Sequence, residues 1–392
     1  MATGAHQDRP GRTELGRVLI SADALSSDWV PSFAAVPRSA FLPDLIWPFD
    51  MATGRSVGVS RAEEPEAWYG YADADVPIVT QWDDGEHSGK AAGRVATSSA
   101  SMPSVVFRML QALAVQPGNQ VLEIGSGTGW NAALLAHRLR TENVVTIEVD
   151  EAVATTARGA LERFGLPVEV VHGDGFKGYA DRAPYDRIIA TCGLRAIPFT
   201  WVQQCRPGGV IVAPWGTHFG NGDAVVRLVV SDDGESALGL FSGPVEFMKL
   251  RAQRLGPVVH REYVTGSVAD GDETETNLVE GDFLGSGRFS PQSFALGLRV
   301  RDCVHTVADK RDGARPMWLY SLTDRSWACV MFRDGDTARV WQAGPRRLWD
   351  EAEAAYRWWE QNGKPGHDRF GLTVTAEGQA VWLDDPAHSW PL

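Results

Sequence analysis

The sequence predicts a doubly wound, Rossmann-like α/β fold followed by a C-terminal α+β extension. Between residues 104 and 213, short apolar stretches alternate with helix-spaced ones, and this alternation stops after Trp215. A chain of 392 residues also exceeds the usual size of a single hydrophobic core. We therefore expect a flexible N-terminus over residues 1–16, a first domain over 17–255 and an extension over 256–392.

The segment before the alternation carries weaker signals. Residues 15–48 have a helical pattern interrupted by Pro31, Pro37 and Pro43. Residues 49–95 are rich in Gly, Asp and aromatic residues, a composition typical of loops with short strands.

The alternating segment predicts a parallel sheet, because strands that alternate with helices are joined by crossovers and covered on both faces. The expected strands are 120–124, 144–148, 168–172, 187–191 and 209–213, and the expected helices are 104–114, 130–140, 151–164 and 198–205.

After residue 215 the pattern changes. Apolar stretches at 224–230 and 237–241 flank an Asp-Asp-Gly-Glu turn, which predicts a hairpin. Residues 264–287 contain Asp and Glu but no Lys or Arg, and we expect a linker or mobile loop there. The remainder is rich in tryptophan, which more often indicates a small domain's core than a peptide-binding face. A helix is expected over 348–361.

Composition limits the possible functions. The net charge of −13 disfavours nucleic acid as a partner, because such a surface repels phosphate backbones. The four cysteines show no paired spacing, so neither a metal site nor a disulfide framework is expected. No segment resembles a signal peptide or reaches membrane-spanning length, and we expect a cytoplasmic protein that makes no membrane contact.

The strongest chemical signal is the stretch from Val121 to Gly129, an apolar strand that enters a Gly-x-Gly-x-Gly turn and then a helix. Glycines let the backbone approach a ligand, and the helix N-terminus offers unpaired N–H groups. Glu148 ends the next strand, where a carboxylate can accept both hydroxyls of a ribose. Asp174 ends the third strand, where it can meet an adenine amino group. These features indicate an S-adenosylmethionine site.

Two other interpretations of this loop remain open. A nicotinamide dinucleotide site would have a further glycine where Asn131 stands, and the acidic Glu123 suits a cationic ligand better than a pyrophosphate. A purely structural turn is the other alternative. The residues expected to bind S-adenosylmethionine are Glu123, Gly125, Ser126, Gly127, Gly129, Glu148, Val149, Asp174, Gly175 and Thr191.

The chain resembles the protein-L-isoaspartate O-methyltransferase family over roughly residues 17–250. The resemblance rests on segments in family order: Ser32–Arg38, Phe41–Pro43, Tyr71–Pro77, Ala96–Pro103, Glu123–Gly129, Gly173–Gly175, Ala183–Ile189, Arg206–Gly209 and Val212–Gly216. It implies a class I methyltransferase domain, and it places Ser99 at the family's substrate serine.

The chain also departs from the family pattern. The proline of the substrate stretch is displaced to Pro103, the apolar end of the family's domain is replaced by Val245–Arg251, and a long extension follows. Extended relatives of this type resemble methyltransferases associated with ribosomally made peptides (lanthipeptides, lasso peptides and graspetides). That resemblance implies methylation of a normal aspartate in a modified precursor peptide and closure to an aspartimide, with the extension recognising the substrate.

The expected chemistry needs no general base, because an aspartyl carboxylate is already ionised at neutral pH. Proximity and alignment would supply most of the catalysis. We expect Ser99 and Ser101 to hold the acceptor carboxylate, with help from the N-terminus of the helix near Ser104. The alternative is that these serines only cap that helix. The alternatives to peptide tailoring are a general isoaspartate repair enzyme and a non-catalytic binding protein that uses the fold as a scaffold. The oligomeric state is left open.

Overall fold

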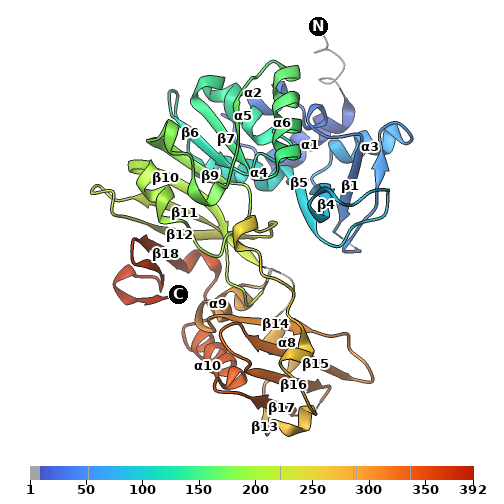
Figure 1. The fold of residues 1–392 in the computed structure, drawn as a ribbon, viewed down its shortest axis with the longest axis vertical. Coiled ribbons are helices and arrows are strands. Elements are labelled where there is room, and N and C mark those ends of the chain that lie inside the picture. The colour runs from blue at the N-terminus through green and yellow to red at the C-terminus, as the bar shows by residue number, and fades with distance from the viewer. Residues whose placement is uncertain (1–8, 52, 221, 286, 288, 336) are drawn as a thin grey trace.

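The computed structural model describes residues 9–392 except 52, 221, 286, 288 and 336. Within these residues the strands form a small N-terminal sheet, a ten-stranded central sheet and a five-stranded C-terminal sheet. Figure 1 shows the N-terminal sheet beside the central one and the C-terminal sheet at the opposite end of the molecule. In the described residues, no helix is both long enough and apolar enough to cross a membrane.

The N-terminal part is more regular than its sequence predicts. Residues 1–8 of the expected flexible N-terminus lie outside the described residues, but residues 10–16 belong to the first helix, so flexibility was the wrong expectation for them. Arg9 anchors this helix through an ion pair with Asp73. The elements are α1 (Pro10–Ser21), α2 (Val30–Ala35), β1 (Leu45–Asp50), β2 (Arg55–Ser56), β3 (Val59–Ser60), α3 (Pro65–Ala72), β4 (Ile78–Trp82), the 3-10 helix η2 (Asp83–Gly85) and β5 (Ala96–Ala100).

The central sheet confirms the predicted doubly wound fold. Its parallel part has the order β8-β7-β6-β9-β10. The order reverses at β6, and in open α/β sheets ligands bind at the carboxyl ends of the strands beside such a switch point. The elements are α4 (Pro103–Leu113), β6 (Val121–Ile124), α5 (Trp130–Leu139), β7 (Val144–Glu148), α6 (Glu151–Phe164), β8 (Glu169–His172), η4 (Gly175–Lys177), β9 (Tyr185–Ala190), α7 (Phe199–Gln204) and β10 (Cys205–Trp215).

Local sequence explains why these elements begin and end where they do. The side chain of Asp150 caps α6 by accepting from the backbone N–H groups of Ala152 and Val153. Gly165 ends the same helix in the left-handed conformation that glycine adopts without strain. Strand β6 is buried along its whole length, as expected for a central strand covered on both faces.

The predicted hairpin is confirmed by β11 (Asp223–Val230) and β12 (Ser236–Val245), which pair antiparallel next to β10. The last strands of the chain then return to this sheet. They are β18 (Phe370–Thr375), β19 (Gly378–Leu383) and β20 (Ser389–Pro391), and β18 pairs with β12. Figure 1 shows these red strands beside β12. Residues 256–392 are therefore divided between two sheets.

The C-terminal sheet has the order β13-β17-β16-β15-β14. Its edge strand β13 (Asp272–Thr276) lies within the acidic segment 264–287, which was expected to be a linker and instead pairs with β17. Charged residues on an edge strand discourage pairing with other chains, which accounts for this composition. The other elements are α8 (Glu280–Leu284), α9 (Pro291–Arg299), β14 (Cys303–Val307), β15 (Ala314–Ser321), β16 (Trp327–Arg333), β17 (Ala338–Ala343) and α10 (Leu348–Gln361), the last as predicted.

The two large sheets share one hydrophobic core. Phe294 of α9 lies with its ring centroid 5.0 Å from that of Phe241 in β12 and 6.3 Å from that of Trp215 in β10. Phe370 of β18 completes the group at 6.1 Å. Of the tryptophans that follow this helix, half are buried (Trp327, Trp349, Trp359 and Trp382) and half are partly buried (Trp318, Trp341, Trp358 and Trp390). Most of their surface therefore serves packing.

Candidate active site

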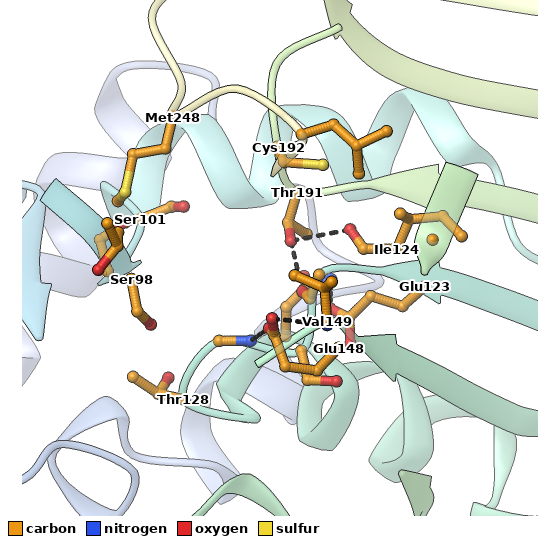
Figure 2. A pocket seen from close by; sticks show the side chains of 18 of the residues that line it. Ser98, Ser101, Glu123, Ile124, Thr128, Glu148, Val149, Thr191, Cys192 and Met248 are labelled. Carbon is orange, nitrogen blue, oxygen red and sulfur yellow. Dashed lines mark hydrogen bonds between the residues drawn. The ribbon is translucent and has the colours of Figure 1, made fainter. Parts of the chain in front are cut away.

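A hollow opens at the carboxyl ends of β6, β7 and β9, beneath strand β5. Figure 2 shows Ser98 and Ser101 on one side of this hollow, Thr191 and Cys192 facing them, and Met248 above. The lining residues are Thr97, Ser98, Ser99, Ala100, Ser101, Val106, Glu123, Ile124, Gly125, Ser126, Gly127, Thr128, Trp130, Asn131, Ile147, Glu148, Val149, Gly175, Thr191, Cys192, Met248, Lys249, Leu250, Arg251 and Arg254. The structure thus brings both predicted serines and most of the predicted cofactor residues to one site.

The glycine loop is shaped by backbone conformations and close approaches that exclude side chains. Gly125 and Gly127 have φ values of +96° and +50°. A Cβ on Gly125 would lie 2.8 Å from the Thr191 hydroxyl, and one on Gly127 would lie 3.2 Å from the Ser99 carbonyl oxygen. The loop can therefore present bare backbone to a ligand.

Glu148 is held in position by backbone donors. One carboxylate oxygen accepts from the N–H of Gly127 at 3.1 Å, and the other accepts from Val149 at 2.9 Å and Asp150 at 3.2 Å. Glu148 and Val149 both line the hollow, at the end of the strand where an acid was expected to hold a ribose.

Glu123 lies in the floor of the hollow and is 0% exposed. Its carboxylate accepts from the Asn131 amide at 2.7 Å and from the Thr146 hydroxyl at 2.5 Å. Burial raises the pKa of Glu123 to about 7, because desolvation outweighs these two hydrogen bonds. The Ser126 and Thr146 hydroxyls are 2.8 Å apart, which links the glycine loop to the same group.

Two of the residues predicted to bind the cofactor, Asp174 and Gly129, do not line the hollow. The carboxylate of Asp174 accepts from the N–H of Phe176 at 3.0 Å and caps η4, so the neighbouring Gly175 lines the hollow in its place. Gly129 begins α5, and a Cβ there would lie 3.3 Å from Leu161, so its role is in packing. Neither residue lines the hollow, and their binding to the cofactor stays a prediction.

Ser99 belongs to β5, where its backbone pairs with Val79 of β4, and Ser101 follows that strand. In the part of the chain that the structure describes, no hydrogen bond engages either hydroxyl. The guanidinium of Arg38 fixes this segment by donating to the carbonyl oxygens of Ala100 at 2.7 Å and Ser101 at 3.0 Å. Burial lowers the pKa of Arg38 to about 9, which leaves it charged at neutral pH.

Neither expectation about the helix beside these serines holds. Met102 is the N-cap residue of α4 and makes no side-chain cap, so the serines do not cap the helix. The backbone N–H of Ser104 is bound by the carboxylate of Asp75 at 2.8 Å, so this helix terminus already has an anionic partner. The hydroxyls of Ser99 and Ser101 remain as the donors that the sequence predicted for an acceptor carboxylate.

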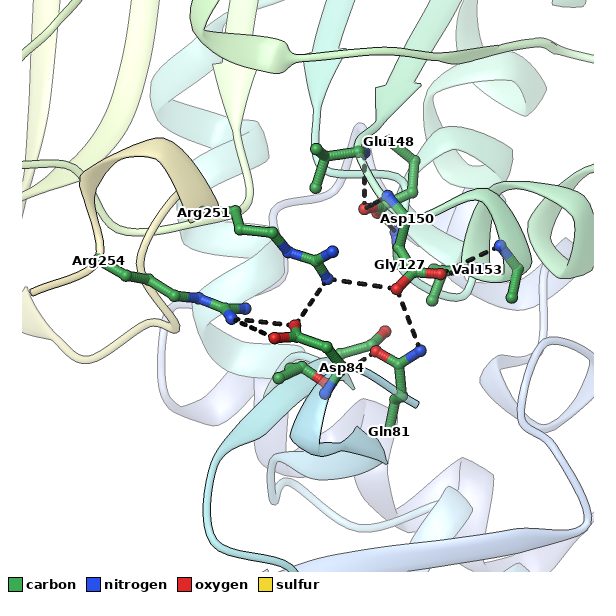
Figure 3. Close-up of polar contacts among 12 residues, drawn as sticks. Gln81, Asp84, Gly127, Glu148, Asp150, Val153, Arg251 and Arg254 are labelled. Atoms are coloured by element: carbon green, nitrogen blue, oxygen red, sulfur yellow. Dashed lines mark hydrogen bonds and ion pairs between the residues drawn. The ribbon is translucent and has the colours of Figure 1, made fainter. Parts of the chain in front are cut away.

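Four charged residues, which we call the arginine clasp, bridge the mouth of the hollow: Asp84, Asp150, Arg251 and Arg254. Arg251 lies 2.9 Å from Asp84 and 3.2 Å from Asp150, and Arg254 lies 3.0 Å from Asp84. Figure 3 shows how the clasp joins η2, the start of α6 and the segment after β12. Sequence reasoning missed both arginines.

The sequence also did not predict that the segment Met248–Leu250 lines the hollow. The Gly193 N–H donates to the Met248 carbonyl oxygen at 2.8 Å, and the Leu250 N–H donates to the Gly193 carbonyl oxygen at 2.9 Å. These bonds fix the segment against the end of β9. The departure of Val245–Arg251 from the family pattern was the available signal.

In the described residues, no three His, Cys, Asp or Glu side chains are grouped to hold a metal ion.

Comparison with known proteins relates this chain to protein-L-isoaspartate O-methyltransferases. The sequence model of protein-L-isoaspartate(D-aspartate) O-methyltransferase matches residues 66–251. A protein-L-isoaspartate O-methyltransferase of Roseobacter denitrificans is 36% identical over 160 residues, which cover 41% of this chain and 69% of that protein. One from Pyrococcus horikoshii is 41% identical over 124 residues, or 31% of this chain and 56% of that protein. The chain thus spans little more than half the length of several curated relatives.

A solved structure of a protein-L-isoaspartate O-methyltransferase aligns with 95% of this chain and 100% of its own, at 22% identity and a TM-score of 0.52. The strand order, the glycine loop and this likeness define a class I methyltransferase fold with an added C-terminal sheet. By sequence the chain belongs to the protein-L-isoaspartate O-methyltransferase family.

Proposed function

We propose that this protein transfers a methyl group from S-adenosylmethionine to the carboxylate of an isoaspartyl residue in a protein or peptide. The observation that carries the proposal is that the glycine loop and the Ser99 segment line the same hollow. Gly127 lies directly against the Ser99 backbone. A cofactor site and an acceptor site would then adjoin, as methyl transfer requires.

The residues around the glycine loop fit S-adenosylmethionine. Gly125 and Gly127 line the hollow with bare backbone at positive φ, and Glu148 offers a carboxylate to ribose hydroxyls. The acidic Glu123 beneath the loop suits a cationic ligand. When bound, S-adenosylmethionine supplies an electrophilic methyl group carried on a sulfonium sulfur.

The side chains in the hollow suit binding and alignment better than acid–base chemistry. An acceptor carboxylate is ionised at neutral pH and can attack without a general base. The Ser99 and Ser101 hydroxyls can each donate a hydrogen bond that orients it. Cys192 also lines the hollow, but burial raises the pKa of its thiol to about 12, so it is protonated and a poor nucleophile.

The product is a methyl ester, and its subsequent chemistry follows from the ester alone. The backbone nitrogen of the next residue attacks the ester carbonyl, the C–O bond to methoxide breaks, and the nitrogen proton leaves with methoxide as methanol. A five-membered succinimide results. Hydrolysis of that ring opens a route back to normal aspartate, which is the repair reading of this activity.

A second candidate substrate is a normal aspartate in a ribosomally made, modified precursor peptide, which would end as an aspartimide. The observation behind it is the C-terminal sheet, which lies beyond residue 251, where the sequence match to the family model ends, whereas the fold of a solved protein-L-isoaspartate O-methyltransferase aligns with 95% of this chain. A peptide is the partner in both readings.

The test is methylation of matched peptides by the full chain with methyl-labelled cofactor. One pool carries isoaspartate, its control pool carries aspartate at the same positions, and a third holds cyclised precursor peptides, all analysed by mass spectrometry. We expect one added methyl group and later loss of methanol on the isoaspartyl pool. Methylation of the precursors alone would replace repair with peptide tailoring, and labelling of no pool would overturn the proposed activity.

A further inference from the structure

A second hollow lies directly behind the wall formed by Met248. Three residues, Met248, Lys249 and Arg254, line both hollows. The second one also reaches the C-terminal sheet through Val304 of β14. Its remaining lining residues are Val95, Ala96, Arg195, His218, Glu246, Phe247, Gln253 and Leu255. A chain that leaves the candidate active site toward the C-terminal sheet would pass here.

Cations outnumber carboxylates among the described residues that line this second hollow. Lys249 lies 2.5 Å and Arg195 lies 2.7 Å from opposite oxygens of the same carboxylate, that of Asp223. Asp223 is 0% exposed and is not a lining residue, whereas the side chains of Lys249 and Arg195 keep 16% and 11% of their surface exposed. With Arg254, three cations line the hollow, against one carboxylate, that of Glu246, among the described residues.

Both cations retain capacity for a further partner. Lys249 donates to Asp223 and to the Phe247 carbonyl oxygen, which uses two of the three donors of an ammonium group. The Nε of Arg195 is buried with no hydrogen-bond partner among the described residues. His218 is half-buried beside them, and burial together with the charges of Arg195 and Lys249 lowers its pKa, so it adds a neutral polar group.

Two glycines make room for this cluster. A Cβ on Gly193 would lie 2.7 Å from an Asp223 oxygen and 3.0 Å from the Lys249 nitrogen. A Cβ on Gly216 would lie 2.5 Å from the other Asp223 oxygen. Buried ion pairs seldom stabilise a fold more than apolar side chains of the same size, so stability alone accounts poorly for the arrangement.

We propose that the second hollow binds the part of the acceptor peptide that flanks the methylated residue, and that Lys249 and Arg195 select an acidic side chain there. This inference rests on the proposed function and narrows its substrate class to acidic peptides. The chain as a whole has a net charge of −13 and repels such peptides, so their selection depends on these local cations.

The test compares two fluorescent isoaspartyl peptides that differ only by Glu or Gln at one flanking position. Their dissociation constants are measured by anisotropy and their KM values with the full chain. We expect the Glu peptide to bind about tenfold more tightly, the usual effect of a charge-assisted hydrogen bond, with the ratio falling as salt is added. Equal constants for the two peptides would overturn the inference.

Variants assign the effect to the cluster. Lys249→Met should abolish the preference for Glu, and Lys249→Arg should keep it. Because Lys249→Met leaves the buried Asp223 with one cation fewer, Arg254→Gln is the safer companion: Asp84 keeps Arg251 as a partner, and the preference should shrink. Lys310→Met, which removes a charge paired with Glu280 and Asp334, is the control and should leave the preference intact.

The two levels of proposal fail in different ways. Tighter binding of the Glu peptide without any methylation would remove the proposed function and leave the subsite. Methylation with the same KM for both peptides would keep the function and remove the subsite. A preference that survives both Lys249→Met and Arg254→Gln would place the selection elsewhere on the protein.

Discussion

Gly127 of the glycine loop lies against the backbone of Ser99: a Cβ atom on Gly127 would stand 3.2 Å from the Ser99 carbonyl oxygen. The loop expected to bind the cofactor and the strand expected to hold the acceptor are thus in direct contact. A change on either side reaches the other, which makes this pair a good starting point for mutagenesis.

Gly127→Val should abolish cofactor binding, because the side chain would need a positive φ and would push the loop away from Ser99. We expect affinity for S-adenosylmethionine in calorimetry to fall at least about 100-fold, equivalent to about 2.7 kcal/mol. Gly118→Val is the matched control, since Gly118 has a φ of +87° but a Cβ there meets no atom within 4 Å. Similar losses in both variants would point to backbone strain alone.

Ser99→Ala should slow methyl transfer and spare cofactor binding. Removing one donor to a charged carboxylate should lower kcat/KM by about tenfold. Ser98→Ala is the comparison, because the Ser98 hydroxyl already accepts from Thr80 at 3.2 Å. Steady-state kinetics with an isoaspartyl peptide would check this, and an unchanged rate for Ser99→Ala would remove its assigned role.

Glu123 should make the ligand-free protein less stable as pH rises. Burial raises its pKa to about 7, against about 4.3 in an unfolded chain. Below the unfolded value both states are protonated and no penalty exists. As pH rises to about 7, the unfolded state ionises first and stability is lost, by up to about 4 kcal/mol above that pH.

Glu123→Gln should remove this loss. Urea unfolding at about pH 4 and pH 8 should show the variant gaining stability relative to the unmodified protein as pH rises. The exposed Glu142→Gln serves as the control. Parallel pH profiles for Glu123→Gln and the unmodified protein would contradict the raised pKa.

Phe294→Ala should loosen the packing of α9 on the central sheet, because Phe294 contacts Trp215, Phe241 and Phe370 of that sheet. The C-terminal sheet should be destabilised with it, because the two sheets share one hydrophobic core. We expect a loss of about 3–5 kcal/mol and a single calorimetric transition at lower temperature. Phe289→Ala, at a ring 37% exposed, should change little. Two separate transitions, with only one shifted, would mean that the sheets unfold independently.

Local signals predicted the central sheet well. The buried strands near Val121 and Val144 are short apolar runs, and the glycine loop between β6 and α5 has a direct sequence signature. The N-terminal strand β1 was missed because a helical pattern was expected as far as residue 48, which lies within the strand. The acidic strand β13 was missed because composition dominated over its Thr–Glu alternation.

The parts of the site that the sequence did not predict depend on tertiary contacts. Arg251 and Arg254 reach the mouth only because η2 brings Asp84 beside α6. The same holds for Asp75, which occupies the helix terminus expected to assist Ser101. Such partners lie far apart in the sequence, and no local sequence pattern indicates that they form a pair.

The return of β18 to pair with β12 has a consequence for the order of folding. The central sheet reaches its ten strands only when residues 370–391 are present, after the whole C-terminal sheet has been synthesised. Until residues 370–375 have been synthesised, β12 is left as an exposed edge of the sheet. Long-range strand pairing of this kind is slow, so we expect the pairing of β18 with β12 to be a late step in folding. A chain truncated before residue 370 would leave the β12 edge exposed and prone to aggregation.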